Sequence, residues 1–207
     1  MLAARKPKSV IAVEPNAEMR SIGQRDSGQT GIDWREGSGE DTGLPPECCD
    51  LLTMASSFHW VDFDKGTKEF FRVLRPGGRF AALWNPRYLE ANPVLLNIEQ
   101  HLHELEPGLR RVSSGRSGMT ETLAQRLSDS PFFENVLYLE ARFVVTRTVE
   151  DYIGAWKSTN DVQAQLGPRK FGLFLDFARL ALRDYEAVEV TYLTRAWSAR
   201  RRDGARL

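Results

Sequence analysis

Cysteines, long apolar runs and an excess of charge of one sign are all lacking or scarce in this sequence, and each shortage excludes a class of protein. The two cysteines, Cys48 and Cys49, are adjacent, and neighbouring residues rarely bridge, so a disulfide framework is excluded and a reducing compartment is favoured. No apolar run approaches the roughly 20 residues that cross a bilayer. The basic N-terminus lacks the apolar core of a signal peptide. We therefore expect a cytoplasmic protein without a membrane segment.

The charges balance, because Lys plus Arg and Asp plus Glu each number 28. No global field therefore favours nucleic acid or an anionic membrane. Five arginines gather between Arg195 and Arg206, with a single aromatic residue, Trp197, among them. We interpret them as the solvated end of a helix or strand rather than as a nucleic-acid arm. His101 and His103 are two residues apart on a predicted helix and face different directions, so no metal site is predicted.

The first part of the chain alternates between apolar runs and helical segments. Leu51–Ala55 and Phe80–Trp84 are almost continuously apolar, which is typical of parallel strands buried on both faces. Between them, Asp62–Arg75 has the spacing of an amphipathic helix, which Pro76-Gly77-Gly78 would end. The earlier elements are predicted as a strand at Ser9–Val13, a helix over residues 16–22 with Asn16 as N-cap, and a weaker strand at Ile32–Trp34.

The rest of the chain predicts further helices and two more strands. Helices are expected at Pro93–Leu105 and at Thr120–Leu127. Two more are expected to begin at the capping-box sequence from Thr148 and at Pro168. The strands are expected at Val136–Thr146 and Val188–Tyr192, and Arg110–Met119 reads as a loop. The pattern predicts an α/β fold: a Rossmann-like, doubly wound, mostly parallel sheet with an antiparallel strand at one edge.

Glu14 directly follows the first predicted strand. In open α/β sheets, ligands bind just beyond the carboxyl ends of the strands. A carboxylate at that position can accept two hydrogen bonds from a ribose diol. The alternative interpretation is a surface glutamate that caps the next helix.

Small and polar residues follow two later strands. Gly37-Ser38-Gly39-Glu40 would let a flat purine approach the backbone, and an ordinary loop is the alternative. In Ala55-Ser56-Ser57-Phe58-His59-Trp60, the small Ala55 and Ser56 leave room for a ligand. His59 is a candidate base or substrate-orienting group, with a structural histidine bonded to the backbone as the alternative. Trp60 is expected to pack against the protein.

The sequence resembles the class I S-adenosylmethionine-dependent methyltransferases in an ordered set of segments: VIAVEPNAEM, GEDTGLPPECCDLLTMASSFHWVD and EFFRVLRPGGRFAALWN. RVLRPGG alone is common in that superfamily. SFHW narrows the resemblance to the small-molecule branch called methyltransferase type 11, which includes trans-aconitate-type enzymes. The resemblance covers Val10–Trp84, and weaker similarity continues in FFENV and TVEDYIGAWKS.

The resemblance implies S-adenosylmethionine as cofactor, a small-molecule acceptor, and catalysis by in-line positioning without an obligatory base. It implies one domain over residues 1–207, with residues 1–86 as the cofactor half and residues 87–207 as substrate-covering helices and the last two strands. The implied cofactor residues are Glu14 at the ribose, Ser38, Gly39 and Glu40 near the adenine, and Ala55 and Ser56 beside the methionine. The implied substrate pocket contains His59, Trp84 and Asn85.

One part of the family pattern is missing from this sequence, because its first strand and Gly-rich loop would lie ahead of Met1. We therefore expect an N-terminally truncated fold and a cofactor affinity below that of an intact relative. The strands ending at Glu14 and Ala55 must then pair directly or leave open edges. The alternatives to an active enzyme are a non-catalytic remnant or binding module of the same fold and, less favoured, a dinucleotide-dependent oxidoreductase.

Overall fold

The computed structural model describes residues 7–110 and 118–205, and the chain divides into two compact units. The first unit comprises Met1–Ala82, Gln125–Leu137 and Ser198–Leu207, and the second comprises Leu83–Ala124 and Tyr138–Trp197. Most of the predicted loop at Arg110–Met119 lies outside the described residues. The expected single domain stays a prediction.

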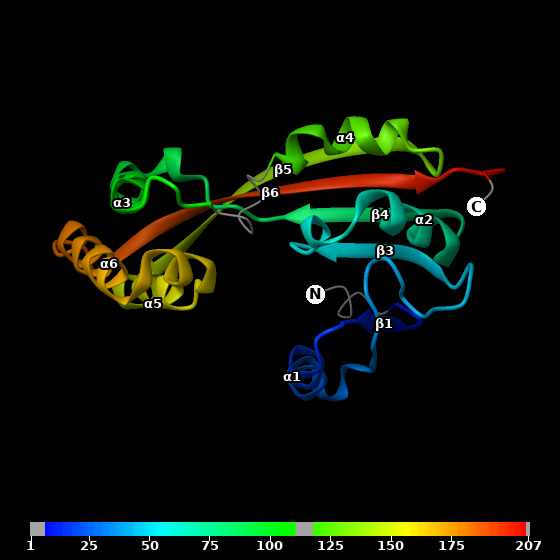
Figure 1. Ribbon diagram of the computed structural model, residues 1–207, viewed down its shortest axis with the longest axis horizontal. Helices are drawn as coiled ribbons and strands as arrows, with labels where there is room; N and C mark the ends of the chain where they lie inside the picture. Colours follow the sequence, from blue (N-terminus) through cyan, green and yellow to red (C-terminus); the bar gives the residue numbers. More distant parts are fainter. Residues whose placement is uncertain (1–6, 111–117, 206–207) are drawn as a thin grey trace. The chain divides into compact units, whose positions relative to one another are not determined.

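The first unit opens with a small parallel sheet covered by a helix (Figure 1). The strands β1 and β2 pair from Val10 opposite Ile32 to Val13 opposite Arg35. The side chain of Asn16 caps the helix between them by accepting from the Met19 N–H at 3.0 Å, as predicted. The elements are β1 at Val10–Val13, α1 at Ala17–Ser27, a short 3-10 helix at Gly28–Thr30 and β2 at Ile32–Arg35.

A strand–helix–strand unit follows in the same part of the chain, as the sequence predicts. Asp62 caps α2 by accepting from the Lys65 N–H at 3.0 Å. The helix ends at Val73, before Pro76. Strand β4 then begins at Leu74 and includes the Pro-Gly-Gly segment, where Gly77 has a φ of 76°. The helix therefore stops before the expected Arg75, and Pro76-Gly77-Gly78 belongs to the strand rather than ending the helix. The elements are β3 at Cys49–Ala55, a short 3-10 helix at Phe58–Trp60, α2 at Phe63–Val73 and β4 at Leu74–Trp84.

The remaining strands join this second sheet in the order β3-β4-β6-β5, with β5 at Phe133–Thr148 and β6 at Ala187–Arg201 (Figure 1). The mixed α/β architecture confirms the predicted fold class. The structure differs from a single continuous sheet, because β1 and β2 form a two-stranded sheet of their own. We expected β1 and β3 either to pair directly or to leave open edges. The prediction of direct pairing is therefore wrong.

The burial of β3 differs from the prediction. Its strand assignment is confirmed, but Leu51 is 49% exposed and Ala55 is also exposed. β4 has the buried character predicted for both strands, with Phe80 and Ala82 fully buried. The reason is position, because β4 lies between two strands whereas β3 ends the sheet order.

Aromatic side chains form the core of the first unit. Phe80 of β4 lies 4.9 Å from the ring of Phe70 and 5.1 Å from that of Phe58, measured between centroids. The centroid of the Phe133 ring lies 6.0 Å from that of Phe80. All four are fully or almost fully buried. Aromatic rings at these separations add specific edge and face contacts to the hydrophobic burial.

The interpretation of the C-terminal arginines as a solvated end is partly wrong. Arg200 and Arg201 close β6, which agrees with the end of a strand. The Arg201 guanidinium, however, lies 4.3 Å from the centre of the Phe71 ring and donates to the Phe71 carbonyl at 3.0 Å. It also pairs with Glu47 at 2.9 Å. This arginine therefore fastens the last strand to α2 rather than facing solvent.

The second unit is mainly helical. Thr148 caps α5 by accepting from the Asp151 N–H at 3.1 Å, which confirms the predicted start. Gly167 interrupts α6 with a φ of 68°, so Pro168 opens its second segment as expected. The helices are α3 at Pro93–Leu105, α5 at Val149–Lys157 and α6 at Asn160–Ala181. A 3-10 turn at Leu89–Ala91 precedes α3. Helix α4 at Met119–Asp129 begins in the second unit and ends in the first. The core includes Leu95, Ile98, Leu102, Tyr152, Trp156, Phe174 and Val190.

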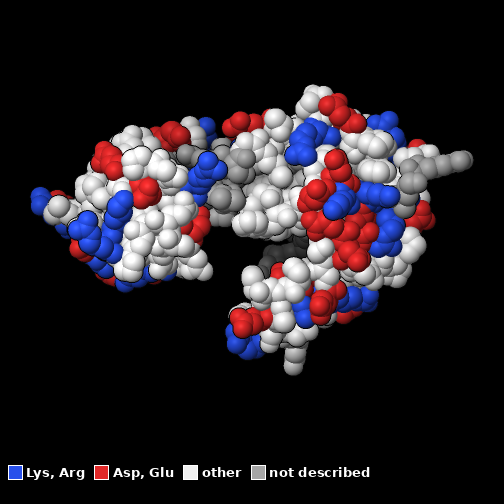
Figure 2. All heavy atoms as spheres, in the orientation of Figure 1, with Lys and Arg blue, Asp and Glu red and all other residues white. Residues whose placement is uncertain are grey.

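The surface carries both signs of charge. On the face shown in Figure 2, acidic and basic side chains lie intermingled over the region of α2. This helix and its cap contain Asp62, Asp64, Lys65, Lys68, Glu69 and Arg72. Of the helices in the described residues, none combines the length and the apolar character that a membrane crossing needs.

Candidate functional site

Glu14 stands at the carboxyl end of β1, as predicted. Its N–H donates to the Arg35 carbonyl at 3.1 Å, which extends the pairing with β2 by one residue. Its carboxylate Oε1 accepts from the N–H of Asn16, the N-cap of α1, at 2.8 Å. A carboxylate has about four acceptor positions. This single bond therefore fixes the group and leaves capacity for a diol.

The loop after β2 lies against the end of β1. A side chain at Gly37 would meet the Val13 Cγ1 and the Thr42 carbonyl, each 2.9 Å from an added Cβ. At the other end of the loop, Gly39 lies so close to Val61 that an added Cβ would be 2.5 Å from a Val61 methyl. Both glycines are therefore required by close approach, and the loop spans from β1 to the residues just before α2.

Ser38 and Glu40 are engaged in holding this loop. The Ser38 Oγ accepts from the N–H groups of Glu40 and Asp41, each at 3.2 Å. The Glu40 Oε1 accepts from the Asp62 N–H at 2.8 Å. That backbone hydrogen bond is the main reason why the pKa of Glu40 lies below its ordinary value. The two side chains thus tie the loop to itself and to the start of α2.

A buried carboxylate that the sequence analysis missed secures the loop further. Glu69 of α2 accepts from the Thr42 N–H at 3.0 Å and from the Thr42 hydroxyl at 2.5 Å. It also accepts two hydrogen bonds from Arg72, both at 2.7 Å. Burial alone would raise the pKa of Glu69, but the bonds from Arg72 and Thr42 outweigh it and lower that pKa. We call Thr42, Glu69 and Arg72 the loop clamp.

The residues after β3 carry a strained backbone. Ser56 has a φ of 48°, a left-handed value that is uncommon for a residue other than glycine. Glu47 and Asn135, which are not candidate site residues, have similar φ values of 51° and 48°, so this conformation alone does not mark a site. Ala55 and Ser56 are both exposed, and their place beside a ligand stays a prediction. Nothing in the sequence indicated the left-handed φ of Ser56.

His59 lies in the 3-10 turn that follows. Burial lowers the pKa of His59 below its usual value, so the ring is neutral at neutral pH. Its ring centroid lies 4.7 Å from that of Trp60. Trp60 is 70% exposed, so the expectation that it packs against the protein is wrong. Within the described residues, no three His, Cys, Asp or Glu side chains are grouped to hold a metal ion.

Trp84 and Asn85, two of the three predicted substrate-pocket residues, belong to the second unit. Trp84 is 2% exposed, and its ring meets that of Trp197 edge-on at 5.5 Å. Asn85 is exposed, and its Oδ1 accepts from the Thr194 hydroxyl at 3.0 Å. The buried position of Trp84 makes it a core residue of its own unit, and the pocket role of both residues stays a prediction.

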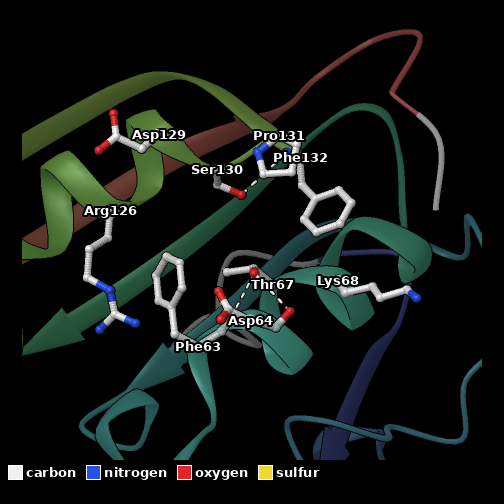
Figure 3. Close-up of a pocket in the computed structure, with 9 residues that line it drawn as sticks. All are labelled: Phe63, Asp64, Thr67, Lys68, Arg126, Asp129, Ser130, Pro131 and Phe132. Carbon is white, nitrogen blue, oxygen red and sulfur yellow. Dashed lines mark hydrogen bonds between the residues drawn. The ribbon is translucent and has the colours of Figure 1, made fainter.

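A groove of about 540 Å³ opens between α2 and α4 of the first unit (Figure 3). The Phe63 and Phe132 rings face this space, and the Arg126 guanidinium lies 3.9 Å from the centre of the Phe63 ring. The predicted site residues are not among those that line it. The lining residues are Phe63, Asp64, Thr67, Lys68, Arg126, Asp129, Ser130, Pro131 and Phe132.

Known proteins resemble the first part of the chain in sequence. Residues 1–82 match the family model of the methyltransferase domain. An uncharacterised methyltransferase of Schizosaccharomyces pombe is 35% identical over 86 residues, which are 42% of this chain and 34% of that protein. The ubiquinone/menaquinone biosynthesis C-methyltransferase UbiE of Rubrivivax gelatinosus is 37% identical over 83 residues, which are 40% and 33% of the two chains. The chain thus spans about a third of the length of these curated relatives.

Solved structures extend the similarity to the whole fold. A provisionally named type II methyltransferase from Anaeromyxobacter dehalogenans superposes with a TM-score of 0.64 at 23% identity, covering 95% of this chain and 82% of that one. A provisionally named methyltransferase from Bacillus halodurans gives a TM-score of 0.52 at 16% identity, covering 95% and 84%. The resemblance seen in the sequence is therefore confirmed: the chain is similar to the methyltransferase domain family over residues 1–82, and its fold is that of methyltransferase structures.

Proposed function

We propose that this chain binds S-adenosylmethionine and serves in methyl transfer to a small molecule. One observation carries the proposal: the Glu14 carboxylate is fixed at the end of β1, beside a glycine-containing loop that the loop clamp ties to α2. These residues lie within the segment that matches the methyltransferase domain. The residues present thus fit the ribose and the adenine of that cofactor.

Glu14 would accept hydrogen bonds from the two ribose hydroxyls through the acceptor positions that Asn16 leaves unused. The adenine would lie along the backbone of Ser38, Gly39 and Glu40, because the Ser38 and Glu40 side chains already have partners. Ala55 and Ser56 would border the methionine portion. When bound, the cofactor supplies the electrophilic methyl group, and the chain contributes position and orientation.

For the acceptor, we propose a small molecule, with His59, Trp84 and Asn85 as the residues that would approach it. His59 is neutral, so it can accept a proton or a hydrogen bond at neutral pH. We propose a cytoplasmic location, which the free cysteines Cys48 and Cys49 support. We also propose that the chain has no nucleic-acid partner, which the even balance of 28 basic and 28 acidic residues supports.

Calorimetry with S-adenosylhomocysteine tests the proposal. We expect the unaltered chain to bind and Glu14→Gln to bind about tenfold to a hundredfold more weakly, since a hydrogen bond to a charged group contributes about 1.5–3 kcal/mol. Glu18→Gln is the matched control, because Glu18 lies one turn away in the first turn of α1 and is exposed. Its affinity should equal that of the unaltered chain.

Two outcomes would overturn the proposal. If S-adenosylhomocysteine does not bind, the chain is a non-catalytic remnant or binding module. If a thermal shift occurs with NADH and none with S-adenosylhomocysteine, the fold serves a dinucleotide instead.

A further inference from the structure

The edge strand β5 exposes a long apolar segment. Within the described part of the chain, β5 is hydrogen-bonded on one side only, to β6. Every residue from Tyr138 to Val144 is exposed, including Leu139 at 58% and Phe143 at 42%. Because successive side chains alternate between faces, apolar surface is exposed on both faces of the strand. This segment, Tyr138–Val144, is called the β5 edge.

The β5 edge lacks most of the features that normally protect such a strand. Proteins blunt free edges with proline, charged side chains (lysine above all), bulges or very short strands. The charged residues of the β5 edge are Glu140 and Arg142, which are of opposite sign. The sequence YLEARFV contains no proline, glycine or lysine, and β5 is 16 residues long. An edge of this kind is a template for pairing with another strand.

The sequence of the β5 edge is complementary to itself. When two copies run antiparallel with Ala141 opposite Ala141, Glu140 stands opposite Arg142 twice, and Leu139 stands opposite Phe143. Opposite charges and apolar pairs that face each other directly stabilise a sheet. Tyr138 and Val144 face each other in the same register.

Neighbouring registers lose this complementarity. A shift by one residue places Leu139 opposite Arg142, or Glu140 opposite Phe143. A shift by two places Glu140 opposite Glu140, or Arg142 opposite Arg142, and like charges that face each other are destabilising. Among these registers, only the one centred on Ala141 pairs every charge with its opposite.

The side chains of the β5 edge are already held by their own unit. The Arg142 guanidinium lies 4.1 Å from the centre of the Tyr88 ring, and the Phe143 ring stacks on Tyr192 at 5.2 Å. The Glu140 carboxylate accepts from the Tyr138 hydroxyl at 2.6 Å. A guanidinium stacked by its face keeps its N–H groups directed sideways, where a carboxylate can accept them. Less side-chain entropy is therefore lost on pairing.

From these observations we infer that β5 is a self-association surface. Two copies of this chain pair through antiparallel β5 edges about a twofold axis at Ala141, and the sheet continues from one copy into the other. This inference is independent of the cofactor site and of the methyl acceptor.

Disulfide trapping tests the register. In a background of Cys48→Ser and Cys49→Ser, Ala141→Cys should give a covalent dimer on mild oxidation, because opposite Cβ atoms lie about 4.5–5.5 Å apart. Leu139→Cys is the matched control on the same face. In this register its two cysteines would lie four residues apart along the strands, about 13 Å, so this variant should remain monomeric on a non-reducing gel. Equal trapping of both variants, or trapping of neither, would overturn the inference.

Charge exchange tests the pairing without cysteine. Sedimentation of Glu140→Arg should show a dimer dissociation constant about tenfold higher, because two attractive pairs become two repulsive ones. The double variant Glu140→Arg with Arg142→Glu restores opposite charges and should return to within about threefold of the original value. Circular dichroism confirms that each variant is folded. A chain that stays monomeric at all soluble concentrations, or a single variant that dimerises as before, contradicts the inference.

Discussion

The two interior strands of the larger sheet differ from its two edge strands in burial, although all four contain apolar residues. β4 and β6 each lie between two strands, and Phe80 and Trp197 at their centres are almost fully buried. β3 and β5 end the order, and Leu51 and Leu139 are 49% and 58% exposed. The large apolar side chains of this sheet that remain exposed lie on its edge strands, although Phe133 at the start of β5 is buried, so an apolar run specifies a strand while its neighbours decide whether the side chains leave water.

The largest expected effect comes from truncating an interior side chain. Phe80→Ala removes the ring that contacts Phe58, Phe70 and Phe133 and should lower the free energy of unfolding by about 3–5 kcal/mol. Leu51→Ala on β3 is the matched edge substitution and should cost less than about 1 kcal/mol, because half of that side chain is already in water. Urea unfolding measures the free energy of unfolding of both variants. Similar losses of stability would contradict the difference between interior and edge strands.

The same contrast holds for ion pairs. Glu69→Gln removes the charge of the loop clamp, whose carboxylate is 9% exposed, and should cost about 2 kcal/mol. The control is Asp50→Asn, because Asp50 pairs with Arg75 at 2.8 Å while 82% exposed. Its expected cost is below about 0.5 kcal/mol. Thermal unfolding of the two variants measures the difference, and a costly Asp50→Asn would contradict it.

Acid should reduce the effect of Glu69→Gln. The pKa of Glu69 lies below 4.5 in the folded chain, since the bonds from Arg72 and Thr42 outweigh the effect of burial. Its stabilisation is therefore present above about pH 4.5 and is lost as the pH falls through the lowered pKa. Urea unfolding of both proteins from about pH 7 to about pH 3 should show their stabilities converging. A constant difference would mean that the charge of Glu69 is not what stabilises the loop.

The smallest expected effect on stability concerns the β5 edge. Leu139→Lys places a charge on an exposed edge position and should change the free energy of unfolding of the monomer by less than about 0.5 kcal/mol. It should nevertheless abolish the dimer, because an edge lysine prevents strand addition. Sedimentation together with chemical unfolding of dilute protein separates these two results. A large loss of monomer stability would mean that the chain itself buries this side chain.

Local signals in the sequence predicted the elements well. Helix α3 runs over Pro93–Leu105 as expected, and the structure adds that Asn92 caps its start; such local signals act within a few residues. Thr148 started α5 for the same reason. The end of β1 at Val13 was likewise predicted, since the apolar run stops there.

Contacts between distant residues were not predictable in the same way. The i, i+3 pair of Glu69 and Arg72 is visible in the sequence, but its bond to Thr42 spans 27 residues and depends on how the loop returns to α2. The exposure of Leu51 depends on which strands pair, and the φ of Ser56 on how the chain leaves β3. The roles of the candidate site residues stay predictions.

The loop clamp should slow the hydrogen exchange of backbone amides in the loop that it holds. The amide of Thr42 donates to Glu69, and the amide of Leu44 donates to the Thr42 hydroxyl at 3.2 Å. Neither amide can meet solvent until its bond breaks, and both bonds depend on Glu69 of α2, the first directly and the second through the Thr42 hydroxyl, which Glu69 accepts. Hydrogen exchange at both positions should therefore proceed at the rate at which α2 unfolds, so that a stretch without regular secondary structure shares the protection of a helix.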